Sequence, residues 1–144
     1  MAAVRRAEVT WQGSLMQGSG TIEAVGSGVL KGLPVSWPAR SEESSGGKSS
    51  PEELLAAAHA ACFSMALSHG LSQAGTPPDT LRTTAEVTFV PGTGITLIAL
   101  AVRGTVPGLD EAGFRAAAEG AKANCPVSKA LAGVPEITLD AALV

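Results

Sequence analysis

Charge and cysteine are both scarce in this chain of 144 residues. Only 16% of the residues are charged, the formal net charge is -3, and no run of basic side chains occurs. Nucleic acids and anionic membranes attract proteins through clustered lysine and arginine, so neither is an expected partner. The N-terminal segment has two arginines without an apolar stretch behind them, and no uninterrupted apolar run approaches the roughly 20 residues of a membrane span. We therefore expect a cytoplasmic protein.

The chain contains two cysteines, Cys62 and Cys125. Two cysteines do not make the disulfide framework of a small secreted protein, and 45% apolar residues are enough for a core without crosslinks. In a reducing compartment such a pair is either redox-active or buried as two small apolar side chains. The residue types alone leave both interpretations open.

The longest expected element is a helix over residues 49–75, with Cys62 in its middle. Ser50 is suited to the N-cap, Pro51 to the first helical position, and Glu53 completes a capping box. The body of this segment is apolar nearly all round, which is typical of a helix packed on most sides. The pattern predicts a long central helix.

Strands are expected on both sides of this helix, where β-branched and aromatic residues alternate or cluster between glycines. The order of elements lacks the strict alternation of a parallel α/β fold, so it predicts a single α+β domain over residues 1–144 with largely antiparallel sheets. The expected strands are 4–11, 20–25, 29–37, 81–90, 95–106 and 137–144, the other helical segments are 110–123 and 127–132, and residues 39–50 form a flexible surface loop.

The two cysteines are expected in different electrostatic environments. Cys125 directly precedes Pro126 at the start of a helical turn, where the positive end of the helix dipole favours a thiolate. Cys62 lies in an apolar helix and needs a cation brought to it before it can ionise. Arg40, in the loop before the helix, is the candidate cation.

Metal binding is an alternative use of the same residues. His59 and Cys62 are one helical turn apart and could share an ion with Cys125, whereas His69 lies about 10 Å beyond Cys62 along the helix axis. Bonds to zinc are near 2 Å and a structural zinc normally has four ligands. We therefore expect no metal, with His59 packed as a helix residue and His69 solvated.

Two segments of the sequence resemble the motifs of one family. PEELLAAAHAACFSMAL, residues 51–67, resembles the central helix of the OsmC/Ohr family of hydroperoxide-reducing proteins, and AKANCPVS, residues 121–128, is similar to that family's second-cysteine motif. His59 ahead of the first cysteine and the three N-terminal segments are more similar to the OsmC branch, osmotically inducible protein C. The resemblance implies an OsmC-like fold that forms an intertwined homodimer.

The resemblance further implies a two-cysteine thiol peroxidase in the oxidative or osmotic stress response. Cys62 is then the peroxidatic cysteine, which becomes a sulfenic acid, and Cys125 the resolving cysteine, which forms a disulfide with it. Arg40 matches the arginine that stabilises the thiolate and the alkoxide leaving group, and Glu52 matches the glutamate that orients this arginine. The implied partners are organic hydroperoxides, with hydrogen peroxide left open, and an external dithiol reductant of the lipoyl type. No bound cofactor is expected.

A dimer also follows from the helix itself. Glu52 and Cys62 are ten residues apart, which corresponds to about 15 Å of rise and roughly 80° of rotation. They cannot share a site within one chain. If Glu52 acts beside Cys62, it comes from a second copy of the helix, and a two-fold dimer supplies that copy.

Two other functions fit parts of the sequence. The same fold could serve as a non-enzymatic binding or structural dimer, although such a module has no physical reason to retain all four site residues. A cysteine-dependent hydrolase lacks a suitable base, because His59 shares a helix with Cys62. For the peroxidase, an apolar pocket favours organic substrates at roughly 0.8 kcal/mol per methylene. Its expected walls are Leu54, Phe63, Met65 and Trp37.

Overall fold

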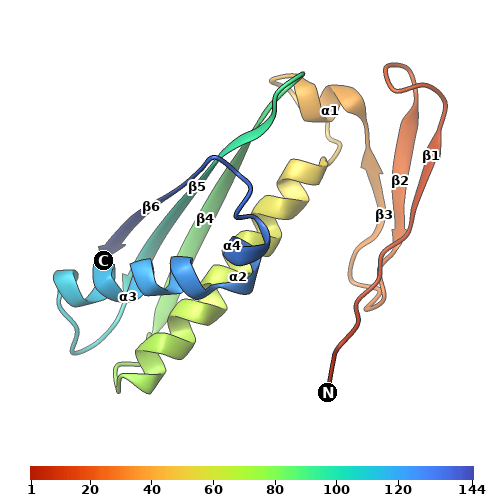
Figure 1. Cartoon of the computed structure of the whole chain (residues 1–144). Helices are drawn as coiled ribbons and strands as arrows, with labels where there is room; N and C mark the ends of the chain where they lie inside the picture. The colour runs from red at the N-terminus through yellow and green to blue at the C-terminus, as the bar shows by residue number, and fades with distance from the viewer. The chain divides into compact units, whose positions relative to one another are not determined.

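The computed structural model describes residues 1–144, and the chain forms two compact units, residues 1–54 and residues 55–144 (Figure 1). Each unit contains one three-stranded sheet, and a long helix begins in the first unit and continues through the second. The expected α+β class is confirmed.

The first unit is an antiparallel meander of three short strands, in the order β1, β2, β3. Its central strand passes closely under a tryptophan: a Cβ at Gly20 would lie 2.7 Å from the Trp11 ring and 2.8 Å from Val35. Only glycine fits between these two side chains. The predicted N-terminal strands are confirmed with shorter bounds, which are β1 Val9–Gln12, β2 Ser19–Ala24 and β3 Lys31–Val35.

A short helix, α1 (Trp37–Ser41), follows the meander where the sequence predicted the end of a strand and the start of a loop. Ser36 is its N-cap, and the Ser36 hydroxyl accepts a hydrogen bond of 3.2 Å from the Ala39 N–H. Pro38 lies in the first turn, where a missing N–H is tolerated. The prediction of a loop beginning at residue 39 was therefore wrong, and Arg40 lies on a helix.

The long helix α2 (Pro51–Gln73) agrees with the predicted central helix (Figure 1). The Ser50 hydroxyl accepts a 3.2 Å hydrogen bond from the Glu53 N–H, as expected of an N-cap. By length and composition α2 could cross a membrane, with a mean hydropathy of 1.4, although core helices of soluble proteins pass the same test. The uninterrupted apolar run within α2 remains shorter than a membrane span, as the sequence indicated.

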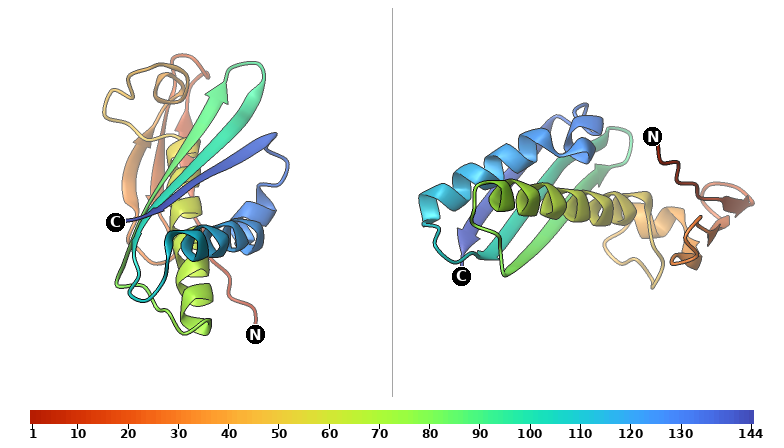
Figure 2. Two further views of the ribbon diagram at one scale, coloured as in Figure 1. Left: turned by 90° about the vertical axis from the view of Figure 1, so that its left-hand side faces the viewer. Right: turned by 90° about the horizontal axis from the view of Figure 1, so that it is seen from below.

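The second unit packs two helices against one face of a sheet (Figure 2). The β4–β5 hairpin is antiparallel as predicted, and β6 joins β5 in parallel, so the sheet order is β4, β5, β6. The helix α3 is capped by Asp110, whose carboxylate accepts a 2.8 Å hydrogen bond from the Gly113 N–H. The bounds are β4 Thr80–Val90, β5 Gly94–Thr105, α3 Glu111–Asn124, α4 Pro126–Ala130 and β6 Glu136–Leu143.

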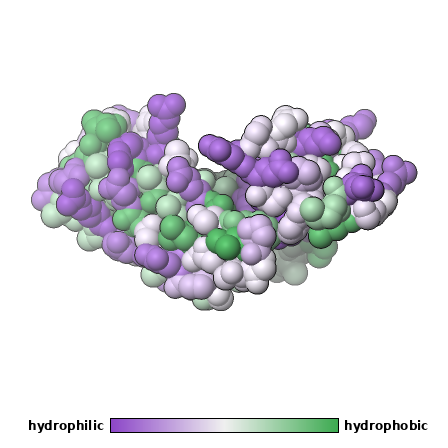
Figure 3. All heavy atoms as spheres, turned by 90° about the horizontal axis from the view of Figure 1, so that it is seen from above, coloured by the Kyte–Doolittle hydropathy of each residue, from purple (hydrophilic) through white to green (hydrophobic).

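The hydrophobic core lies between the sheet and these helices in the second unit. Alternate residues of β5 point into it, because successive side chains of a strand face opposite sides. Apolar side chains also remain exposed, and Figure 3 shows them as green patches among polar residues. The buried members include Phe63, Leu67, Leu71, Ile98, Leu100, Val102, Phe114 and Ala118, and the exposed ones include Val9, Trp11, Leu15, Met16 and Met65.

Candidate functional site

The two cysteines lie together in the second unit. Cys62 is partly exposed on α2, and Cys125 is fully buried between α3 and α4, where it forms the N-cap of α4. Both are free thiols, and the side chain of each shifts the pKa of the other. Residues that are 63 positions apart in the sequence are thus close enough for exchange chemistry between the two sulfurs.

The thiol of Cys62 is held in its protonated form. Burial raises the pKa of Cys62, the hydrogen bond to Cys125 raises it further, and hydrogen bonding to the Val127 backbone lowers it only in part. No cation contributes to this shift. This is the state expected of a cysteine in an apolar helix before a positive charge is brought to it.

The pKa of Cys125 shifts in the opposite direction. Burial alone would raise the pKa of Cys125, but interactions with the Cys62 thiol, with the Ser128 amide and hydroxyl, and with the Val127 amide outweigh it, so the pKa is lowered. As the N-cap of α4, Cys125 makes no side-chain capping hydrogen bond, so the helix start acts on it through the neighbouring groups named above. The start of α4 therefore favours the thiolate at Cys125, as predicted.

Arg40 and Glu52 form an ion pair within the first unit. Arg40 Nε donates to Glu52 Oε1 at 2.9 Å, and the guanidinium carbon lies 5.9 Å from the centre of the Trp37 ring. The Glu52 side chain is 8% exposed and that of Arg40 is 33% exposed. From the sequence we expected Glu52 to come from a partner subunit, whereas the ion pair itself lies within one chain. Whatever copy supplies one of these residues supplies both.

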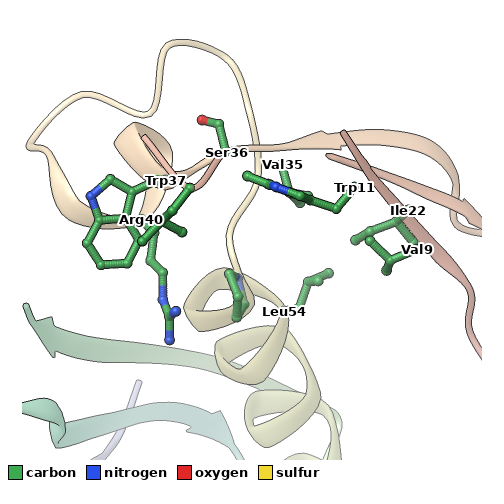
Figure 4. Close-up of a pocket in the computed structure, with 10 residues that line it drawn as sticks. Val9, Trp11, Ile22, Val35, Ser36, Trp37, Arg40 and Leu54 are labelled. Atoms are coloured by element: carbon green, nitrogen blue, oxygen red, sulfur yellow. The ribbon is translucent and has the colours of Figure 1, made fainter. Parts of the chain in front are cut away.

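A cavity of about 300 Å³ adjoins this ion pair in the first unit (Figure 4). Trp37 and Leu54 line it, as expected of the substrate pocket. Phe63 does not, because it is buried in the core of the second unit, and Met65 is 72% exposed on α2. The strand residues in the wall were not predicted from the sequence. The lining is Val9, Trp11, Leu15, Ile22, Val35, Ser36, Trp37, Arg40, Pro51 and Leu54.

A buried histidine accompanies the cysteines. His59 is fully buried, and its Nε2 lies 2.7 Å from Ser128 Oγ, while its Nδ1 has no hydrogen-bond partner. Burial lowers the pKa of His59, so the ring is neutral at pH 7. Sequence reasoning left His59 as either packed or partly exposed and predicted a solvated His69; the structure buries His59 and exposes His69. Sequence reasoning missed Ser128, although Ser128 belongs to the second-cysteine motif.

The metal alternative finds no geometric support. No group of three or more histidine, cysteine, aspartate or glutamate side chains is arranged to hold a metal ion. His59 directs Nε2 to a hydroxyl, and a hydroxyl is not among the usual zinc ligands.

Comparison with known proteins identifies the fold and the family. Solved structures with the same mixed α+β architecture include an organic hydroperoxide resistance protein OsmC from Legionella pneumophila, with a TM-score of 0.70 and 25% identity, covering 98% of this chain and 99% of that one. Another is the organic hydroperoxide resistance protein OhrB of Bacillus subtilis, with a TM-score of 0.62 and 26% identity, covering 96% of this chain and 98% of that one. The chain therefore has the fold of OsmC and Ohr proteins.

Comparison of the sequence with protein families and with known proteins assigns the chain to one family within this fold. The model of the family described as OsmC-like protein matches residues 44–140. A protein of Escherichia coli (strain K12) named Peroxiredoxin OsmC is 43% identical over 143 residues, which cover 97% of this chain and 96% of the relative. This chain belongs to the OsmC family, and the resemblance seen in its two cysteine motifs is confirmed.

Proposed function

We propose that this chain is a thiol peroxidase of the stress response that reduces organic hydroperoxides through Cys62 and Cys125. Membership of the OsmC family and the similarity to a protein named as a peroxiredoxin support the peroxidase activity. The observation that carries the chemistry is the pair of adjacent free thiols, one on α2 and one at the start of α4. A nucleophilic thiolate and a nearby second thiol are what a two-cysteine cycle requires.

The proposed cycle has three steps. The Cys62 thiolate attacks one peroxide oxygen, the O–O bond breaks, and the alkoxide leaves as an alcohol after taking up a proton. Cys62 is now a sulfenic acid, which Cys125 attacks to form a disulfide and release water. An external dithiol then reduces the disulfide by exchange, and a lipoyl-type dithiol is the proposed reductant. No bound cofactor takes part.

The ion pair of Arg40 and Glu52 has the properties needed for the first step. An arginine keeps its charge at all physiological pH values, and Glu52 and Trp37 fix the plane of its guanidinium. We propose that Arg40 stabilises the Cys62 thiolate and the developing alkoxide. The apolar cavity beside Arg40 then takes the organic part of the substrate, with about 0.8 kcal/mol of binding free energy for each buried methylene.

A homodimer is proposed to bring these parts together. Cys62 receives no help from a cation, and only 22% of the most apolar window of α2 is buried. Glu52 and Cys62 are ten positions apart on the continuous helix α2, or about 15 Å of rise. A second copy would cover the apolar helix and supply its Arg40 and Glu52 to each Cys62. In this arrangement residues 1–144 form one OsmC-like domain of an intertwined, cytoplasmic dimer.

Peroxide consumption by the reduced protein tests the function. Cumene hydroperoxide and hydrogen peroxide are supplied separately to wild type, Cys62→Ser and Cys125→Ser, and free thiols are counted after each exposure. We expect wild type to lose two thiols, Cys62→Ser to lose all turnover, and the ratio of the two rates to favour the organic substrate. If neither peroxide oxidises Cys62 faster than a free thiol in solution, catalysis is excluded and the non-enzymatic dimer becomes the better interpretation.

A further inference from the structure

A buried hydrogen-bonded pair lies beside the cysteines and has no part in the cycle described above. His59 on α2 is 0% exposed, Ser128 on α4 is 8% exposed, and His59 Nε2 lies 2.7 Å from Ser128 Oγ. Polar side chains lose hydration when they are buried, so such a pair is costly unless its groups are satisfied. Here the pair joins the two elements that position the cysteines.

Contacts continue from this pair to one of the reacting sulfurs. Ser128 lies on the first turn of α4, three residues after Cys125, which begins that helix. The Ser128 hydroxyl interacts with the Cys125 side chain as a hydrogen-bonding partner. A continuous path therefore runs from Cys125 through Ser128 to His59, entirely within the second unit.

We propose that Ser128 and His59 form a proton relay for the resolving step, in which Cys125 attacks the sulfenic acid of Cys62. The Cys125 thiol gives its proton to Ser128 Oγ while the Ser128 hydroxyl proton passes to His59 Nε2. Ser128 touches the reacting sulfur and is a catalytic residue, whereas His59 acts through Ser128 and is a positioning residue. This inference rests on the proposed function, because it needs a sulfenic acid at Cys62.

The step balances without any further reactant. The Cys125 thiolate attacks Cys62 Sγ, so that an S–S bond forms while the S–O bond of the sulfenic acid breaks. The leaving hydroxide takes the proton back from His59 through Ser128 and departs as water. One thiol and one sulfenic acid thus become one disulfide and one water, and the sulfenic acid is the oxidant.

The state of the histidine suits this role. A neutral imidazole has one lone pair, and the relay assigns it to Nε2, with the hydrogen on Nδ1. After the transfer the Ser128 hydroxyl donates to the Cys125 thiolate, which is the contact that helps to lower the pKa of Cys125. Burial is the cause of the shift at His59, and no charged group contributes to it. The other titratable groups on α2 are Cys62, which is partly exposed, the acidic pair Glu52 and Glu53 in its first turn, and the exposed His69 near its end. On α4 and its N-cap they are Cys125 and the exposed Lys129.

Trapping of the sulfenic acid separates the two chemical steps. One equivalent of cumene hydroperoxide is added to the reduced protein, and samples are quenched over time with dimedone, which labels sulfenic acid, and with an alkylating agent that counts thiols. The variants are His59→Gln, whose amide can still hydrogen-bond to Ser128 but cannot take up a proton, Ser128→Ala, and Ser128→Thr. His69→Gln is the matched control on the exposed face of α2.

We expect disulfide formation to slow by at least about tenfold relative to Cys62 oxidation in His59→Gln and Ser128→Ala, because a positioned base usually contributes a hundredfold or more. The labelled sulfenic acid should persist accordingly. Ser128→Thr, which keeps the hydroxyl, should form the disulfide faster than Ser128→Ala, and only His69→Gln should resemble wild type. In His59→Gln the disulfide rate should rise more steeply with pH than in wild type, because hydroxide replaces the lost base.

Two results would overturn the relay. One is a wild-type rate of disulfide formation in Ser128→Ala, which needs no stable His59 variant and therefore decides the question even if His59→Gln does not fold. The other is a His59→Gln protein whose two steps slow equally with an unchanged pH profile, as a purely structural role predicts. If wild type loses no thiol to peroxide and Cys125→Ser, which cannot form the disulfide, gives no labelled sulfenic acid, the proposed function fails as well, so the two failures are distinguishable.

Discussion

Cys62 and Cys125 have identical side chains, but their surroundings shift their pKa values in opposite directions. The pKa of Cys62 is raised chiefly by burial, and that of Cys125 is lowered by the groups around the start of α4. In the single chain the resolving thiol is thus the more acidic one. The proposed arrival of Arg40 from a second copy reverses this order, because a nearby cation favours the thiolate of Cys62.

The buried His59 should make the protein less stable in mild acid. Burial lowers its pKa below the ordinary value of 6.5, so between the folded pKa and 6.5 the unfolded chain binds a proton that the folded chain does not. Above pH 6.5 the neutral His59 therefore costs the folded protein no unfolding free energy. As the pH falls from 6.5 to the folded pKa, the unfolding free energy decreases by at most about 1.4 kcal/mol per pH unit.

Urea unfolding at several pH values between 7.5 and 5 measures this effect at one protein concentration. We expect wild type to lose more unfolding free energy on acidification than His59→Gln does. The exposed His69→Gln variant, which also removes one histidine, controls for the loss of a titratable group as such. Parallel pH dependences of wild type and His59→Gln would contradict the assignment of a neutral buried ring.

At the residue scale the sequence predicted the site members better than their contacts. Motif and chemistry named four site residues, Cys62, Cys125, Arg40 and Glu52. In the structure Cys62 lies beside Cys125, and Arg40 forms an ion pair with Glu52. Ser128 was missed because a serine after a helix start is usually explained by local capping. Only the fold reveals that it meets a histidine 69 residues away in the sequence.

Helices and strands were predicted well where a regular hydrophobic pattern extends over many residues. They were predicted poorly where a short element has only one or two local sequence signals. The hairpin of β4 and β5 and the helix α2 have regular patterns over ten residues or more. The five-residue helix α1 has only its cap, Ser36, and a proline in the first turn. The same proline also suggests the end of a strand, and that interpretation was the wrong one.

Gly104 on β5 packs closely against Phe114 on α3, so adding one methyl group at this position should lower the stability of the fold. A Cβ at Gly104 would lie 2.6 Å from Phe114 Cζ and 3.2 Å from Leu81 Cδ2. Gly104→Ala should therefore lower the unfolding free energy by about 1–3 kcal/mol, as overpacked cores do. Gly120→Ala is the matched control, because nothing lies within 4 Å of its Cβ and alanine favours the helix.

Denaturant unfolding of both variants tests this packing. The expected order of midpoints is Gly104→Ala below wild type, with Gly120→Ala equal to wild type or slightly above it. A Gly104→Ala midpoint equal to that of Gly120→Ala would show that the β5–α3 contact is looser than the structure indicates.

The whole molecule is expected to be a dimer because of the surface that α2 leaves uncovered. Ala57, Ala61 and Met65 are exposed and four positions apart, so they lie along one face of this helix. Apolar area of this kind is stabilised by contact with a second copy at about 25 cal/mol per Å². The dimer stays a prediction from the sequence, and its residue contacts depend on a second chain and cannot be derived from one.

A charge on this face should separate the copies. Ala61→Glu is expected to convert the dimer to monomer in light scattering at micromolar concentration, with loss of peroxidase activity, because a carboxylate cannot be buried there without a partner. Ala116→Glu, at a likewise exposed alanine on α3, adds the same carboxylate outside this face and should remain dimeric and active. If Ala61→Glu stays dimeric with full activity, another surface makes the contact. A wild-type monomer that is fully active would exclude the dimer.

The exposed apolar side of α2 also links activity to abundance. When folding depends on association, mass action stabilises the folded form as the protein concentration rises. Below the dissociation constant of the proposed dimer, the number of assembled sites grows with the square of the chain concentration. At such concentrations a doubled supply of the chain would more than double the number of assembled sites of the proposed dimer, and dilution would remove sites faster than chains without any inhibitor.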